Sequence, residues 1–342
     1  MNRRDFLKAV GVGAVSLSAG GCGTWANLMG PKIPEDTNVV FILVDDMGWV
    51  DLACYGNKFT ETPNIDKLAT QGMRFTDAYA ACPVCSPTRA SIMSGQYPAH
   101  IGITDFIPGH WRPYEDLTVP MNRMQMPLET VCIAEALKEQ GYKTGYIGKW
   151  HLGNKGYLPK DQGFDWVAAG VRNENDKRVS GFTEQAVEFI RENKDDKFFL
   201  FLSHHTVHIP LEAPEDLVEK YRKKAKPPTG VNNPVYAAMV EHLDNSTGAI
   251  MNELDDLGLA DNTMVVFFSD NGGLYKPYGG YNGDMAPVAT NAPLRAEKGT
   301  LYEGGVREPL IVRWPGVVKA GSTCSEIVTS VDFYPTLLKG AG

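Results

Sequence analysis

The stretch Asn38-Val39-Val40-Phe41-Ile42-Leu43-Val44-Asp45-Asp46 decides the fold class. A continuous apolar run of this length is typical of a strand buried on both faces of a parallel sheet. The run stops abruptly at two adjacent carboxylates. These nine residues therefore predict a central parallel strand with an acidic pair beyond its carboxyl end.

The rest of the chain alternates between strand-like and helix-like segments. Thr62-Pro63 offers an N-cap and a proline at the first helical position, and Gly141 follows the end of a helical pattern. Strands are predicted over 38–44, 143–148, 198–203, 263–269 and 310–313, and helices over 62–71, 130–140, 182–193, 236–257 and 331–338. This order predicts an α/β fold with a doubly wound, mostly parallel sheet covered by helices on both faces.

Polar residues follow four of the predicted strands, where sheets of this kind bind their ligands. They are Asp45 and Asp46, Lys149 and His151, the histidines 204, 205 and 208, and Asp270 with Asn271. The oxygen ligands of Asp and Asn suit a hard cation such as calcium or magnesium. Capping of helices and turns is the alternative for these acids. The clustered histidines could instead bind zinc or pack internally.

The pentapeptide Cys85-Ser86-Pro87-Thr88-Arg89 has the C-x-P-x-R pattern in which one cysteine is oxidised to formylglycine. The hydrated aldehyde offers two hydroxyls on one carbon. A buried structural cysteine beside a turn proline is the simpler interpretation, and Cys82-x-x-Cys85 could also be a redox motif. Arg89 lies four residues after Cys85, so the two side chains share a face if a helix begins at this motif.

From this pentapeptide outward, the chain resembles the type I sulfatases, the arylsulfatase family with an alkaline-phosphatase-like fold. The motifs that carry the resemblance are Gly148-Lys149-Trp150-His151-Leu152-Gly153, the run from His204 to Pro210, and the segment from Leu294 to Pro309 that contains Lys298. The resemblance covers about 38–338 and is closest to the branch of arylsulfatase A and N-acetylgalactosamine-6-sulfatase. Relatives usually continue into a small C-terminal subdomain that this sequence lacks, and we expect a fragment of a longer protein.

The resemblance implies a role for each matching residue. Calcium, with magnesium as the alternative, would be bound by Asp45, Asp46, modified Cys85, Asp270 and Asn271. Arg89 would steady the hydrated aldehyde, and Lys149 would bind a sulfate oxygen. His151 would take a proton from a hydroxyl of the hydrate. His208 and Lys298 would contact the sulfate and assist departure of the alcohol.

The expected function is therefore hydrolysis of a sulfuric ester, from a sulfated sugar or an aryl sulfate. A phosphonate or phosphate monoester hydrolase of the same superfamily is one alternative. A non-catalytic protein that binds sulfated glycans is the other. The expected partners are the sulfated substrate and, during maturation, a formylglycine-generating enzyme.

The bulk composition and the N-terminus restrict the setting of this activity. The net charge of −8 over 342 residues argues against a general nucleic-acid or anionic-membrane binder. Arg3-Arg4 followed by an apolar run from Ala9 to Gly21 resembles a twin-arginine export signal. We expect 1–34 to be this signal with a linker, 35–342 to be the catalytic domain, and the location to be periplasmic or at the cell surface. Cys22 is a candidate lipid acceptor.

Overall fold

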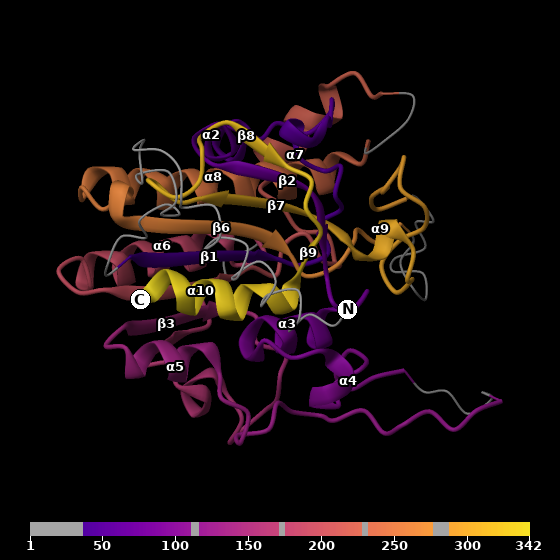
Figure 1. Ribbon diagram of the computed structural model, residues 1–342. Helices are drawn as coiled ribbons and strands as arrows, with labels where there is room; N and C mark the ends of the chain where they lie inside the picture. The colour runs from indigo at the N-terminus through magenta and orange to yellow at the C-terminus, as the bar shows by residue number, and fades with distance from the viewer. Residues whose placement is uncertain (1–36, 111–115, 171–174, 228–231, 276–286) are drawn as a thin grey trace, which may run out of the picture. The chain divides into compact units, whose positions relative to one another are not determined.

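The computed structural model describes residues 37–110, 116–170, 175–227, 232–275 and 287–342. The predicted export segment 1–34 and Cys22 lie outside these residues. One mixed sheet runs through the described part (Figure 1), in the order β4-β3-β5-β1-β6-β7-β2-β8, with β9 paired to β2. Its strands are β1 (Asn38–Val44), β2 (Met73–Tyr79), β3 (Lys143–Gly148), β4 (Trp166–Ala168), β5 (Phe198–Ser203), β6 (Thr263–Ser269), β7 (Arg307–Arg313), β8 (Ser322–Cys324) and β9 (Val328–Thr329).

Strand direction explains how distant segments meet at one edge of this sheet. β1 pairs in parallel with β5 and β6, and β3 pairs in parallel with β5. Among the described strands only β7 runs in the opposite direction, because it is antiparallel to both β6 and β2. The segment that enters β7 therefore lies at the edge where β1, β3, β5 and β6 end.

Helices cover both faces of the sheet, as predicted. They are α2 (Pro63–Gln71), α3 (Cys85–Ser94), α4 (Pro98–Ile101), α5 (Ile133–Glu139), α6 (Val179–Glu192), α7 (Glu215–Lys223), α8 (Pro234–Asp256), α9 (Glu303–Val306) and α10 (Phe333–Ala341). Val40, Ile42 and Val44 share one core cluster with residues of α2, α6, α7 and α8. Val39, Phe41 and Leu43 share the other with residues of α3, α5 and α10. The alternation of side chains along β1 thus fills both cores.

The predicted elements are all present, with shifted ends. Predicted helix 130–140 begins only at Ile133, because Cys132 occupies its N-cap. Predicted strand 310–313 begins earlier, at Arg307, and predicted helix 331–338 is a 3-10 turn over Ser330–Asp332 followed by α10. Strand β2 was not predicted, because this half-buried segment carries Arg74, Thr76 and Asp77 and lacks an apolar run.

Helix α2 begins at Pro63, but Thr62 does not cap it with its side chain. Asp244 of α8 does so instead. Its Oδ1 accepts a hydrogen bond from the backbone N–H of Ile65 at 2.7 Å, and its Oδ2 accepts one from that of Asn64 at 3.1 Å. The free N–H groups of the first turn are therefore satisfied across the interface between two helices.

No helix within the described residues is both long enough and apolar enough to cross a membrane.

Candidate active site

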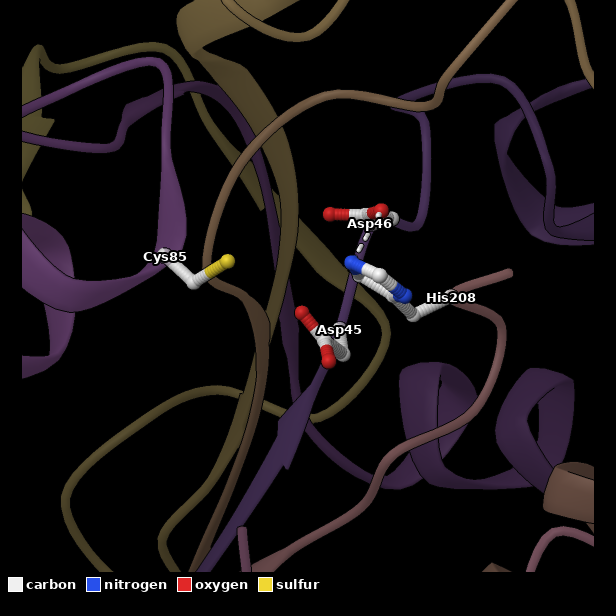
Figure 2. Close-up of side chains that lie close together, drawn as sticks. All are labelled: Asp45, Asp46, Cys85 and His208. Carbon is white, nitrogen blue, oxygen red and sulfur yellow. Dashed lines mark ion pairs between the residues drawn. The ribbon is translucent and has the colours of Figure 1, made fainter. Parts of the chain in front are cut away.

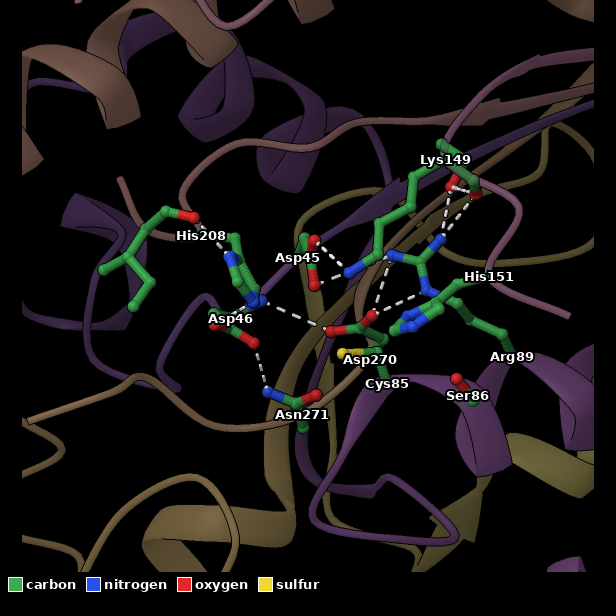
Figure 3. Close-up of polar contacts among 12 residues, drawn as sticks. Asp45, Asp46, Cys85, Ser86, Arg89, Lys149, His151, His208, Asp270 and Asn271 are labelled. Atoms are coloured by element: carbon green, nitrogen blue, oxygen red, sulfur yellow. Dashed lines mark hydrogen bonds and ion pairs between the residues drawn. The ribbon is translucent and has the colours of Figure 1, made fainter. Parts of the chain in front are cut away.

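The structure brings the predicted site residues together at the edge where the parallel strands end (Figure 3). Asp45 and Asp46 follow β1, Lys149 and His151 follow β3, His208 follows β5, and Asp270 with Asn271 follows β6. Cys85 and Arg89 come from α3, and Lys298 comes from the segment before β7. Residues that are widely separated in the sequence thus form one polar cluster.

Helix α3 begins at Cys85, so the predicted helical spacing of Cys85 and Arg89 is present. Both side chains are buried. Arg89 donates from Nε to Oδ2 of Asp270 at 2.8 Å, and its second terminal nitrogen lies 2.7 Å from the same oxygen. Its first terminal nitrogen donates to the carbonyl oxygen of Lys149. Arg89 therefore joins α3 to the ends of β6 and β3.

Lys149 reaches Asp45 because of the glycine before it. Gly148 has a φ of 107°, and a Cβ there would lie 1.9 Å from the carbonyl oxygen of Ser203, so only glycine fits. Lys149 Nζ then lies 2.6 Å from Asp45 Oδ2. Burial acts to lower the pKa of Lys149, but Asp45, Cys85 and Asp270 together outweigh it and the pKa is raised. Lys149 is thus held as a cation at the end of β3.

Asp46 is the most heavily contacted acid of the site. Its Oδ1 accepts a hydrogen bond from Asn271 Nδ2 at 2.7 Å, and Lys298 Nζ lies 2.6 Å from the same oxygen. His208 Nε2 lies 3.6 Å from Oδ2 (Figure 2). Asp46 has a φ of 65°, a conformation that is uncommon outside glycine and is found at functional positions.

Four side chains could hold a metal ion. Ligand atoms of Asp45, Asp46, Cys85 and His208 all lie within 4.8 Å of one another (Figure 2). Asp45 Oδ1 and Asn271 Oδ1 are buried and have no hydrogen-bond partner among the described residues. Buried oxygens without a partner are costly unless a cation or water satisfies them. These oxygens therefore fit a hard, oxygen-preferring divalent ion.

The charges of the site nearly balance. Asp45, Asp46 and Asp270 lie against Arg89, Lys149 and Lys298. Burial opposes ionisation of Asp45, but Lys149, His208 and Arg89 together hold its pKa well below the usual range. Burial and the neighbouring charge of Asp45 raise the pKa of Asp270. A divalent cation added to this balanced set would leave net positive charge, which attracts an anionic substrate.

Cys85 is a poor nucleophile as an unmodified thiol. Burial raises its pKa to about 11, against the opposing charges of Lys149 and Lys298. Lys298 Nζ lies 3.9 Å from Sγ. The thiolate is the reactive form of cysteine, so a raised pKa leaves the side chain inert at neutral pH.

His151 is held in one tautomer. Its Nε2 lies 2.7 Å from the carbonyl oxygen of Ile107, which can only accept, so Nε2 carries the proton. Nδ1 is buried and has no partner among the described residues, so its lone pair is available. Burial and the charge of Lys149 lower the pKa of His151 to about 4. The ring is therefore neutral at neutral pH and can accept a proton.

His204 and His205 do not belong to the metal-capable group found among the described residues. His204 is fully buried, and its ring meets Phe182 edge-on at 5.9 Å. His205 stacks on the same ring at 5.8 Å. Of the two alternatives for these histidines, zinc binding and packing, the contacts support packing.

Two serines that were not predicted as site residues hold the site together. Ser203 Oγ accepts a hydrogen bond from Arg89 at 2.6 Å and lies 2.7 Å from the carbonyl oxygen of Lys149. Ser269 Oγ accepts one from the backbone N–H of Met47 and donates to the carbonyl oxygen of Asn271, both at 3.0 Å. Each serine is the last residue of an apolar strand, just before the segment that carries site residues, which is a signal visible in the sequence.

The side chains of the site differ in their exposure to solvent. Arg89 and Asp270 are 1% and 0% exposed, so they form its floor. The side chain of His208 is 31% exposed, and those of Lys149 and Lys298 are each 12% exposed. The cations on the open side would therefore meet an entering anion first.

Comparisons with known proteins agree with this geometry. The model of the family described as Sulfatase matches residues 37–342. Arylsulfatase A of Homo sapiens is 31% identical over 92% of this chain and 66% of its own length. N-acetylgalactosamine-6-sulfatase of Homo sapiens is 30% identical over 90% of this chain and 63% of its own. The chain thus spans about two thirds of the length of these relatives.

A solved structure described as Ps i-CgsB in complex with k-i-k-neocarrahexaose superposes with a TM-score of 0.75 and 31% identity. The superposition covers 90% of this chain and 72% of that one. At this level of similarity the two chains share their fold as well as a related sequence.

Proposed function

The chain belongs to the sulfatase family, and from this we propose that it hydrolyses sulfate esters with formylglycine at position 85 and a calcium ion. The observation that carries the proposal is the position of Cys85. Its side chain lies at the start of α3, among Asp45, Asp46 and His208, and 3.9 Å from Lys298. An oxygen nucleophile at this position would face the sulfur atom of a bound sulfate ester, and the surrounding cations would contact the oxygens of that sulfate.

The oxidised residue would supply a nucleophile that the buried thiol does not, and the ion would satisfy the buried oxygens that have no hydrogen-bond partner. When present, formylglycine supplies a hydroxyl nucleophile as its hydrate, and calcium supplies positive charge for the sulfate oxygens. Asp45, Asp46, Asp270 and Asn271, with residue 85, would hold the ion. The unpartnered oxygens of Asp45 and Asn271 support this assignment. His208 also lies in the metal-capable group, which supports a place for it beside the ion.

The remaining groups bind charge and move protons. Lys149 and Lys298 would bind sulfate oxygens as fixed cations, where preorganised charge stabilises the transition state. Arg89 is held by Asp270 and Ser203 at the buried floor of the site, and from there it would orient the side chain of residue 85. His151 would accept a proton at Nδ1, since Nε2 is already committed to Ile107. His208 and Lys298 would donate toward the departing oxygen.

We propose a sulfated saccharide as the natural substrate. Ps i-CgsB, which was solved with an oligosaccharide, shares 31% identity with this chain. His208, Lys149 and Lys298 are partly exposed, which is consistent with a bulky alcohol group that remains outside the buried floor of the site. The twin arginines within 1–34 support export to the periplasm or cell surface after a formylglycine-generating enzyme has acted.

Two measurements on one preparation test the proposal. Peptide mass spectrometry should find residue 85 about 18 Da lighter than cysteine, and hydrolysis of 4-nitrophenyl sulfate should increase with that modified fraction. Cys85→Ala should remain folded and lose turnover, whereas Cys324→Ala, a thiol on β8, should retain it. Full turnover by Cys85→Ala would refute the proposal. Faster cleavage of an aryl phosphonate would favour the alternative hydrolase, and binding without cleavage would favour a glycan-binding protein.

A further inference from the structure

A pocket lined by charged residues lies beside the site and is not used by the proposed reaction. Its volume is about 360 Å³, and it is lined by Lys177, Arg178, His205, Pro210 and Glu212. Pockets of this size accommodate small ligands. Its lining combines two cations, one carboxylate and one imidazole, so the cavity has an excess of positive charge while the protein carries −8.

The loop after β5 joins this cavity to the catalytic residues. The backbone N–H of His208 donates to the carbonyl oxygen of His205 at 3.1 Å, and His208 Nε2 lies 3.6 Å from Asp46. Lys177 Nζ donates to the carbonyl oxygen of Pro210 at 2.6 Å. One short loop therefore presents His208 to the catalytic site and His205 with Pro210 to the cavity.

Charged groups of the catalytic site also act on residues that line the cavity. Burial lowers the pKa of Lys177, and the charges of Glu212, Asp45 and Asp46 oppose that shift. Burial also lowers the pKa of His205 to about 3, with smaller effects from Asp45 and Lys149. The two ring nitrogens of His205 can exchange hydrogen bonds with a sugar hydroxyl.

The two cations are held in place by the backbone before α6. Lys177 and Arg178 both have positive φ angles, 53° and 65°, and Asp176 accepts a hydrogen bond from the backbone N–H of Arg178 at 2.6 Å. Arg178 also donates from one terminal nitrogen to the carbonyl oxygen of Ala169 at 3.0 Å. Within the described residues this is the one side-chain hydrogen bond of Arg178, so the other N–H groups of its guanidinium remain available.

We propose that this cavity is a substrate subsite that binds a second anionic group, a carboxylate or a further sulfate ester, on the saccharide whose sulfate is cleaved. The inference rests on the proposed function and makes it more specific. Arg178 would bind the anion through its free N–H groups, and Lys177 would add a point charge. Glu212 would accept hydrogen bonds from neighbouring hydroxyls, and His205 would accept or donate them. The preferred substrates would be glycans with at least two negative charges within one or two sugar rings.

Kinetics with matched substrates test the subsite. The double variant Lys177→Gln/Arg178→Gln is compared with Lys143→Gln, an exposed lysine at the opposite end of β3. The substrates are 4-nitrophenyl sulfate, a disaccharide with one sulfate, and that disaccharide with an added uronate or an added sulfate. For the last two, kcat/KM of the double variant should fall about 10- to 100-fold. For the first two, and for Lys143→Gln on every substrate, the change should be within about two-fold.

The pattern of losses distinguishes the outcomes. A larger loss on the uronate or on the disulfated disaccharide identifies the anion that is bound. Restoration of at least part of the loss by Lys177→Arg/Arg178→Lys would support a role of charge, since that variant keeps both cations. Equal losses on all substrates, or no loss on the doubly anionic ones, would overturn the proposal.

A binding measurement separates this proposal from that of the reaction. In the full chain with Cys85→Ala, calorimetry compares the disulfated with the monosulfated disaccharide. A preference for the disulfated sugar that disappears with Lys177→Gln/Arg178→Gln supports the subsite even if no ester is cleaved. Equal affinity for both sugars refutes it, even if the wild-type chain is an active sulfatase.

Discussion

Lys298 Nζ lies 2.7 Å from Asp46 Oδ2, although 252 positions separate the two residues along the chain. The pair exists because β7 is antiparallel to β6, which brings the segment before β7 to the edge where β1 ends. Lys298 thus pairs with Asp46, while Lys149 pairs with Asp45. Burial acts to lower the pKa of Lys298, but Asp46, Cys85 and Asp45 together outweigh it and the pKa is raised, so Lys298 is a cation at neutral pH.

Lys298→Met should lower kcat for 4-nitrophenyl sulfate by about 10²- to 10³-fold, the usual cost of losing one preorganised charge at a transition state. It should also lower the melting temperature, since Asp46 loses its closest cation. Steady-state kinetics and thermal melting provide the measurements. Lys319→Met, an exposed lysine on another loop, serves as the control and should behave as wild type. A wild-type kcat in Lys298→Met would exclude the catalytic role.

Removal of divalent ions should lower both turnover and the melting temperature, and calcium should restore them. A ligand that binds only the folded state stabilises it by about 2.7 kcal/mol at a hundred times its Kd. Asn271→Ala should raise the calcium concentration needed for restoration at least about ten-fold, because Oδ1 of Asn271 is a candidate ligand.

The calcium titration is followed by thermal melting, so it does not depend on turnover. Asn252→Ala, on the exposed side of α8, is the matched control and should titrate as wild type. An unchanged calcium dependence in Asn271→Ala would remove this residue from the ligand set.

Asp51 should make stability depend on pH. It is fully buried, and burial raises its pKa from 3.8 to about 7, against hydrogen bonds from Tyr236 and Gly48. The folded state therefore keeps the proton that the unfolded state loses above pH 3.8, so stability falls as the pH rises from about 4 to 7. The shift corresponds to about 4 kcal/mol at its upper limit.

Asp51→Asn cannot ionise and should lose this part of the pH dependence. Urea unfolding at pH 4, 5.5 and 7 should show its free energy of unfolding rising relative to wild type across the series. Asp261→Asn, at an exposed position, should follow the wild type. A constant difference between Asp51→Asn and wild type at all three values would contradict the assignment.

Asp244→Ala should destabilise the protein by about 1–3 kcal/mol, because two backbone N–H groups of α2 lose their acceptor. Urea unfolding at neutral pH measures this. Asp255→Ala changes an exposed acid of the same helix and should alter stability by less than about 0.5 kcal/mol. Equal effects of the two substitutions would show that the contact between α2 and α8 contributes nothing specific.

Much of the fold could be predicted because the central strands are buried on both faces. β1, β5 and β6 are continuous apolar runs, and short runs of this kind are typical of strands in the middle of a parallel sheet. β2 and β4 escaped prediction because half-buried and very short strands carry mixed residues whose pattern matches loops as well. The antiparallel direction of β7 could not be predicted either, because the residue pattern of a strand is the same in both orientations.

The candidate site, too, could be predicted only in part. Motifs next to strand ends were sufficient to select Asp45, Lys149 and Asp270, because a parallel sheet collects its strand ends at one edge. The cavity at Lys177 and Arg178 gave no such signal. Two adjacent basic residues before a helix are common, and only the loop from His205 to Pro210 turns them into the lining of a cavity.

The sequence by itself determined the fold class, the family motifs and the residue types available for chemistry, because periodicity and short spacing are local properties of a chain. The tertiary structure alone decided which charges neutralise one another and which oxygens remain free. Arg89 pairs with Asp270, Lys298 pairs with Asp46, and Asn271 Oδ1 stays without a partner among the described residues. These relationships depend on distances of a few ångströms between residues far apart in the chain, and only strand order and strand direction set them.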